Sequence, residues 1–150
     1  MLLFRKKYTK MLQIFSGLAK TFTRGNIYQN LVQRSIFLLT EFNAVDNSEL
    51  GQTTKRYRKP YLIGFYRKRR TADVGDVIKV AVKGRPCKAI VVNTRKRKLD
   101  MEPRYDNNNI VLVDDNLNPL GGKINGPMPT CLRKHKNRYP KVLSQIKTFV

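Results

Sequence analysis

The chain has 150 residues, and 31 Lys and Arg against 10 Asp and Glu give a formal net charge of +21. With 41% hydrophobic residues, a chain of this length can bury the core of one domain, which excludes wholesale disorder. The longest stretches without a charged residue have nine residues, too few to cross a bilayer, so an integral membrane protein is excluded.

The first 33 residues differ in composition from the rest of the chain. They contain basic residues but no acid, interleaved with Leu, Phe, Ser and Thr, which is typical of a mitochondrial transit peptide. The same composition suits a basic arm that stays on the protein and binds RNA, and the two roles can coexist. We therefore expect residues 1–33 to be a mitochondrial targeting sequence or a basic N-terminal extension.

From residue 34 the pattern predicts a mainly β domain that extends to residue 126. Five segments rich in β-forming residues are separated by turn signals, and they span residues 35–45, 60–66, 74–83, 87–94 and 109–114. Several short strands of this kind suggest a small closed five-stranded β-barrel, since closure removes the unpaired strand edges that would otherwise be exposed to aggregation.

The last residues, 127–150, predict a short two-helix C-terminal tail. Thr130 can cap a first helix, and Pro140 interrupts it. Residues 141–149 then place apolar side chains at spacings of four and three, as a helix that packs on one face requires. We expect both helices to pack against the barrel.

Residues with catalytic or metal-binding chemistry do not form a recognisable motif. His135 lies among basic residues, has no evident Ser or Cys partner, and is expected at the surface. Cys87 and Cys131 are expected to be ordinary reduced thiols, and with one His they cannot build an ordinary zinc site without several carboxylates. Asp114 and Asp115 could bind Mg²⁺ beside phosphate, but they precede a turn, which favours Asp for backbone reasons. We expect no enzyme, metal, cofactor or small-molecule substrate.

The positive charge is concentrated in clusters that predict binding to nucleic acid. Solubility needs far less charge, and the basic runs lie beside strand-like sequence instead of along one amphipathic helix, which disfavours a membrane surface. Arginine grips phosphate with two parallel hydrogen bonds, and lysine supplies a point charge. The basic candidates for RNA binding are Lys55, Arg56, Arg58, Lys59, Arg67, Lys68, Arg69, Arg70, Lys83, Arg85, Lys88, Arg95, Lys96, Arg97 and Lys98. Tyr57, Tyr61 and Tyr66 could stack on unpaired bases or belong to the core.

Five segments in the same order and spacing resemble one protein family. They are residues 45–51 (VDNSELG), 74–78 (VGDVI), 88–92 (KAIVV), 104–113 (RYDNNNIVLV) and 118–127 (NPLGGKINGP). Over residues 36–150 the chain is thereby similar to the universal large-subunit ribosomal protein fourteen family. The short basic loop at 95–103, the C-terminal segments and the acid-free leader resemble the animal mitochondrial branch.

The resemblance implies a five-stranded barrel with a helical tail that is bound to large-subunit rRNA. It also implies a place on the face toward the small subunit, beside ribosomal protein nineteen, with a bridge to small-subunit rRNA and a docking surface for the ribosomal silencing (anti-association) factor. Carried over by motif, Asn47, Ser48 and Arg104 would face rRNA. Lys123 and Lys141 would lie near the bridge and silencing-factor surface.

Together these observations predict a non-enzymatic structural protein of the mitochondrial large ribosomal subunit that supports translation. Its expected mechanism is phosphate neutralisation and shape fitting, in which Lys and Arg hold rRNA segments against a rigid scaffold. One alternative is a mitochondrial DNA or RNA binder that acts off the ribosome. The other is an RNA-modifying enzyme, which the absence of a catalytic motif disfavours.

Overall fold

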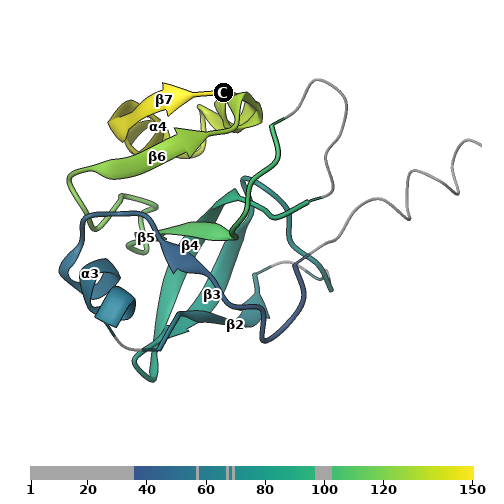
Figure 1. Ribbon diagram of the computed structural model, residues 1–150, viewed down its shortest axis with the longest axis vertical. Coiled ribbons are helices and arrows are strands. Elements are labelled where there is room, and N and C mark those ends of the chain that lie inside the picture. Colours follow the sequence, from purple (N-terminus) through teal and green to yellow (C-terminus); the bar gives the residue numbers. More distant parts are fainter. Residues whose placement is uncertain (1–35, 57, 67, 69, 97–102) are drawn as a thin grey trace, which may run out of the picture. The chain divides into compact units, whose positions relative to one another are not determined.

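The computed structural model describes residues 36–56, 58–66, 68, 70–96 and 103–150 (Figure 1). These residues belong to the unit Arg34–Val150, and the expected leader, residues 1–33, lies outside them. The elements of the unit are β1 (Asn43–Ala44), α3 (Glu49–Arg56), β2 (Tyr61–Phe65), β3 (Val77–Val82), β4 (Arg85–Asn93), β5 (Asn109–Val113), β6 (Ile124–Met128), the 3₁₀ helix η1 (Thr130–His135), α4 (Pro140–Gln145) and β7 (Ile146–Phe149).

A five-stranded sheet in the order β1-β5-β4-β3-β2 forms the main body, so the expected mainly β fold is confirmed. Strands β2 to β5 pair antiparallel with their neighbours, and β1 pairs parallel with β5. Lys83 and Gly84, with φ of 52° and 77°, connect β3 to β4. Positive φ at both central residues is the tight hairpin turn that matches the twist of the two strands.

The expected closure of the barrel is wrong, because the sheet is open between β1 and β2. The segment before β1 meets β2 only through an isolated bridge between Glu41 and Tyr61 and a few backbone hydrogen bonds. Regular pairing fails there because Pro60 has no N–H to donate and Leu39 turns the chain with φ of 66°. The strand expected over residues 35–45 is therefore reduced to the two residues of β1.

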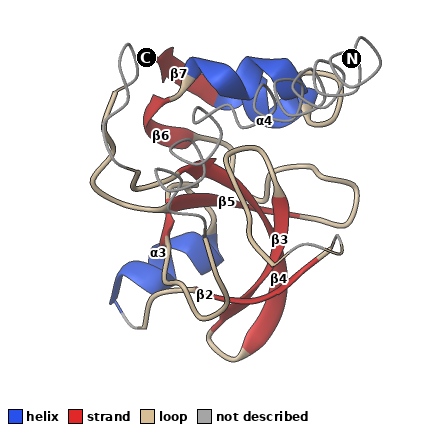
Figure 2. Ribbon diagram, turned by 90° about the vertical axis from the view of Figure 1, so that its right-hand side faces the viewer, coloured by secondary structure: helices blue, strands red, loops and turns tan. Residues whose placement is uncertain are grey.

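Strands β4 and β5 are buried on both faces, so the unit has two hydrophobic cores. Alternate side chains of a strand point to opposite faces. Ala89 and Val91 accordingly pack with β2, β3 and Phe42 in the first core. Ile90 and Val92 pack in the second core, against β6, η1, α4 and β7. The C-terminal elements thus pack against the face of the sheet that carries Ile90 and Val92. Strands β6 and β7 and helix α4 lie close together there (Figure 2).

The tail contains the two short helices that the sequence predicts, followed by a strand that it does not. The second helix, α4, ends at Gln145, and Ile146–Phe149 forms β7 instead of continuing the helix to residue 149. Pairing explains the difference, since β7 runs parallel to β6 with Ile146 opposite Ile124. The apolar spacing that suggested a helix therefore serves a strand that borders the second core.

Candidate RNA interface

The turn that carries Asn47 and Ser48 is fixed by hydrogen bonds inside the protein. Ser48 is buried, and its hydroxyl donates to the carboxylate of Asp46. The same oxygen accepts the Gly51 N–H at 3.0 Å, as a residue that caps the start of α3 does. Asn47 is exposed, and its side-chain oxygen accepts a hydrogen bond from the amide of Gln52 at 2.7 Å. The buried Ser48 stabilises the turn by its hydrogen bonds, whereas the Asn47 side chain is exposed and accessible to a polyanion.

Lys123 lies beside this turn. The Asn47 N–H donates to the Lys123 carbonyl oxygen at 3.0 Å, and the Lys123 side chain is exposed. Gly121 makes the close approach possible, since a Cβ on it would lie 2.8 Å from the backbone nitrogen of Ser48. The structure therefore brings together two residues, Asn47 and Lys123, that the family resemblance assigned to different surfaces.

Most basic candidates that the structure describes lie at the surface. The exposed ones are Arg58, Lys59, Lys68, Arg70, Lys83, Arg85, Arg95 and Arg104, together with Lys123 and Lys141. Lys55 and Arg56 form the last turn of α3. Arg67, Arg69, Arg97 and Lys98 lie outside the described residues.

Lys88 and Lys96 are half-buried and engage acids of the chain itself. The Lys88 Nζ lies 3.0 Å from a carboxylate oxygen of Asp115 and 5.3 Å from the centre of the Tyr66 ring. The Lys96 Nζ lies 2.6 Å from a carboxylate oxygen of Asp73. Both lysines are therefore partly neutralised before any RNA arrives.

The tail carries exposed cations that the motif-based assignment left out. Arg133, Lys134, Lys136 and Arg138 are exposed in and after η1, close in sequence to Lys141. The Arg133 guanidinium lies over the Phe149 ring, 4.4 Å from its centre. The cluster of basic residues in the sequence was the signal that could have identified them.

His135 is half-buried instead of lying free at the surface, because it packs against Gly75 in the VGD turn, residues 74–76. Its ring stacks on Tyr139, with 5.8 Å between ring centres. Tyr139 is buried, and its hydroxyl donates to the Gly75 carbonyl oxygen at 3.0 Å. Burial raises the pKa of Tyr139, with a smaller opposing effect of the Arg138 charge. This contact fixes the tail, and hence its cations, to the loop before β3.

The described residues show no site for a metal ion and no membrane-spanning helix. No three His, Cys, Asp or Glu side chains of the described part gather closely enough to hold a metal ion. None of its helices has both the length and the apolar character needed to cross a membrane.

The family described as Ribosomal protein L14p/L23e matches residues 35–150. The chain belongs to this family. A relative from Danio rerio named "Large ribosomal subunit protein uL14m" is 43% identical over 112 residues, which cover 75% of this chain and 79% of the relative. Both findings confirm the family resemblance of the five motifs and its mitochondrial branch. The chain is thus a ribosomal protein of the mitochondrial ribosome, a structural component and not an enzyme.

Proposed function

We propose that the protein is a structural constituent of the mitochondrial large ribosomal subunit that binds large-subunit rRNA. Membership in the L14p/L23e family and the name of the Danio rerio relative support the subunit. The observation that carries the RNA role is the imbalance of charge at the surface. The net charge is +21, and the ion pairs between described residues engage Lys88 and Lys96, whereas most other described basic candidates are exposed.

The proposed mechanism is phosphate neutralisation on a rigid scaffold. The two cores hold the sheet, the Asn47 turn and the tail in one geometry, so exposed cations on separate loops keep fixed distances from one another. Each cation that reaches a phosphate releases condensed counterions, which makes binding steeply dependent on salt. Recognition then rests on the shape of the folded rRNA more than on its base sequence.

Substituting two exposed cations of one loop tests this mechanism. Replacing Lys68 and Arg70 with Ala should weaken rRNA binding and lower the slope of log affinity against log salt by up to about two units. The matched control replaces Lys88 and Lys96 with Gln, which removes two charges already paired with acids and should change the slope much less. An unchanged slope in the first variant would mean that this loop faces solvent in the complex.

The finer placement within the ribosome is also part of the proposal. Lys123 and Lys141 lie at the surface that bridges to small-subunit rRNA and receives the silencing factor, beside ribosomal protein nineteen. The exposure of both lysines and the rigid attachment of Lys123 to the Asn47 turn support this. Residues 34–126 serve as the rRNA-binding domain, residues 127–150 as the tail, and residues 1–33 as a targeting sequence or basic extension.

Charge reversal at these two lysines separates a bridge role from an rRNA-anchoring role. Replacing Lys123 and Lys141 with Glu should leave the protein in the large subunit and impair subunit joining or docking of the silencing factor. Both effects can be measured on gradients of assembled ribosomes. Loss of the variant from the large subunit would instead identify the lysines as rRNA anchors.

A further inference from the structure

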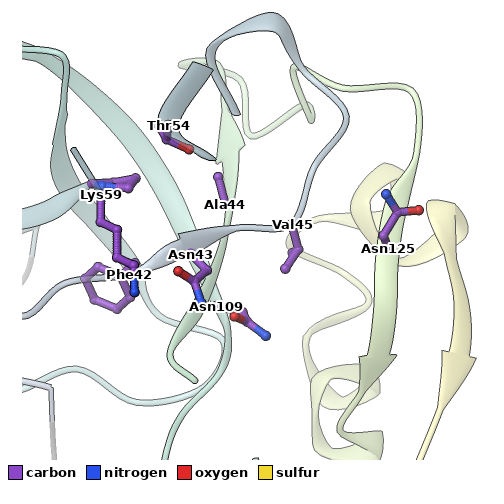
Figure 3. Close-up of a pocket in the computed structure, with 9 residues that line it drawn as sticks. Phe42, Asn43, Ala44, Val45, Thr54, Lys59, Asn109 and Asn125 are labelled. Atoms are coloured by element: carbon purple, nitrogen blue, oxygen red, sulfur yellow. The ribbon is translucent and has the colours of Figure 1, made fainter. Parts of the chain in front are cut away.

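A cleft of about 450 Å³ opens beside β1, at the point where three segments distant in sequence meet (Figure 3). Its volume lies within the range of sites that hold small molecules, about 300–1,000 Å³. The side chains that decide its chemistry are Asn43, Asn109, Asn125, Lys59, Phe42 and Pro60. None of the described residues that line it is acidic.

Three side-chain amides face this cleft. Asn43 and Asn109 are register partners in the parallel pair of β1 and β5. Asn125 comes from β6 and is held beside β1 by its N–H, which donates to the Val45 carbonyl oxygen at 3.1 Å. Within the described part of the chain, none of the three amide groups makes a side-chain hydrogen bond. Each therefore has both a donor and an acceptor available to a ligand.

The remaining lining supplies an apolar floor and one cation. Phe42, Ala44 and Pro60 are buried beneath the opening. Lys59 is exposed, and Figure 3 shows its side chain running toward the Phe42 ring and ending beside it. A ligand that matches this lining has an apolar body, hydrogen-bonding edges and a negative charge at one end.

Several backbone groups beside the cleft already pair within the protein. The N–H groups of Asn43 and Val45 donate to carbonyl oxygens of Asn108 and Ile110, at 2.9 and 3.1 Å. The Val45 carbonyl oxygen accepts from Asn125. Because these three groups are paired, the amide side chains are the hydrogen-bonding groups that the cleft offers beside them.

We propose that this cleft binds one unpaired nucleotide of large-subunit rRNA, with its base among the three amides and its phosphate at Lys59. The inference rests on the proposed rRNA-binding function and names one contact within it. Unpaired bases are the usual target of specific RNA recognition, because their edges are free to form hydrogen bonds. An Asn amide can pair with both N6 and N7 of adenine, so adenine is the preferred base.

Equilibrium binding of the full chain to bulged RNA duplexes tests the proposal. One duplex carries a single bulged adenosine, and a second carries an abasic residue at the same position. Both have the same number of phosphates, so the ratio of their affinities reports the base alone. We expect the adenosine duplex to bind about tenfold more tightly, the effect of one good amide-base pair.

Two variants and one control assign the preference to the cleft. Asn109→Leu and Asn125→Leu should each reduce the preference to below about threefold, and both should bind the abasic duplex as the wild type does. Asn137→Leu removes an exposed amide outside the cleft and should keep the full preference. Asn125 is itself exposed, so its replacement does not disturb either core.

Equal affinity of the wild type for both duplexes would overturn the inference. It would favour a protein segment as the occupant of the cleft. A preference that survives in both Leu variants would overturn it as well. Sedimentation of the same wild-type chain with the large subunit is measured in parallel. Co-sedimentation without a base preference refutes only the cleft, whereas absence from the large subunit refutes the proposed function.

Discussion

Replacing Gly75 with Ala tests how the C-terminal elements are attached to the sheet. Gly75 has φ of 85°, and its N–H donates to the Val91 carbonyl oxygen at 2.8 Å. A Cβ at this position would lie 2.5 Å from the His135 ring and 2.9 Å from the Tyr139 hydroxyl oxygen. Alanine must therefore displace two side chains of the tail or move the turn that precedes β3.

The cost follows from three physical effects. The left-handed backbone costs an alanine about 1–2 kcal/mol. Loss of the buried hydrogen bond between Tyr139 and Gly75 costs about 1 kcal/mol. Overpacking of a buried contact costs about 1–3 kcal/mol. We expect Gly75→Ala to lower the free energy of unfolding by about 3–6 kcal/mol.

Urea denaturation of the full chain measures this loss, and Gly84→Ala is the matched control. Gly84 has φ of 77°, but no atom lies within 4 Å of its would-be Cβ, so its replacement reports backbone strain alone, about 1–2 kcal/mol. Adding His135→Ala to Gly75→Ala should recover part of the excess loss. Equal losses in the two glycine variants, within about 0.5 kcal/mol, would refute the proposed packing of the tail on the VGD turn.

Two further predictions concern the turn at Asn47 and the buried tyrosine. Gly121→Ala should lower the free energy of unfolding by about 1–3 kcal/mol, because its Cβ would lie 2.8 Å from the backbone nitrogen of Ser48. The control is Gly122→Ala, whose Cβ would meet no atom within 4 Å and whose stability should be nearly that of the wild type. Burial raises the pKa of Tyr139 above its ordinary value of 10.0. Above about pH 10 the unfolded state therefore binds fewer protons than the folded state, and stability falls as pH rises. Tyr139→Phe should make this alkaline decline shallower in urea titrations, and an unchanged decline would contradict it.

The strands with strong β-forming patterns could be predicted from the sequence to within a few residues. Apolar runs at 60–66, 74–83, 87–94 and 109–114 correspond to β2 to β5 because local preference and burial agree there. The open side of the sheet could not be predicted in the same way. It depends on how the segment around Leu39 turns and on the missing N–H of Pro60, whose effect on pairing appears only in three dimensions.

The interface was predictable in its charge but not in its geometry. Clustered Lys and Arg indicate an exposed basic surface, and most of the described candidates lie there. The partners of Lys88 and Lys96 could not be predicted, since Asp115 and Asp73 lie 27 and 23 positions away in the sequence. The cleft could not be predicted for the same reason, because Asn43, Asn109 and Asn125 belong to segments that only the fold brings together.

The central claim is that the chain is an integral part of the large subunit of the mitochondrial ribosome. A sucrose gradient of mitochondrial lysate, probed for this chain with and without chelation of Mg²⁺, tests it most directly. We expect the chain to move with intact ribosomes when Mg²⁺ is present and with the large subunit after chelation separates the subunits. A chain that stays near the top of the gradient in both conditions would contradict the account and favour a nucleic-acid binder that acts off the ribosome.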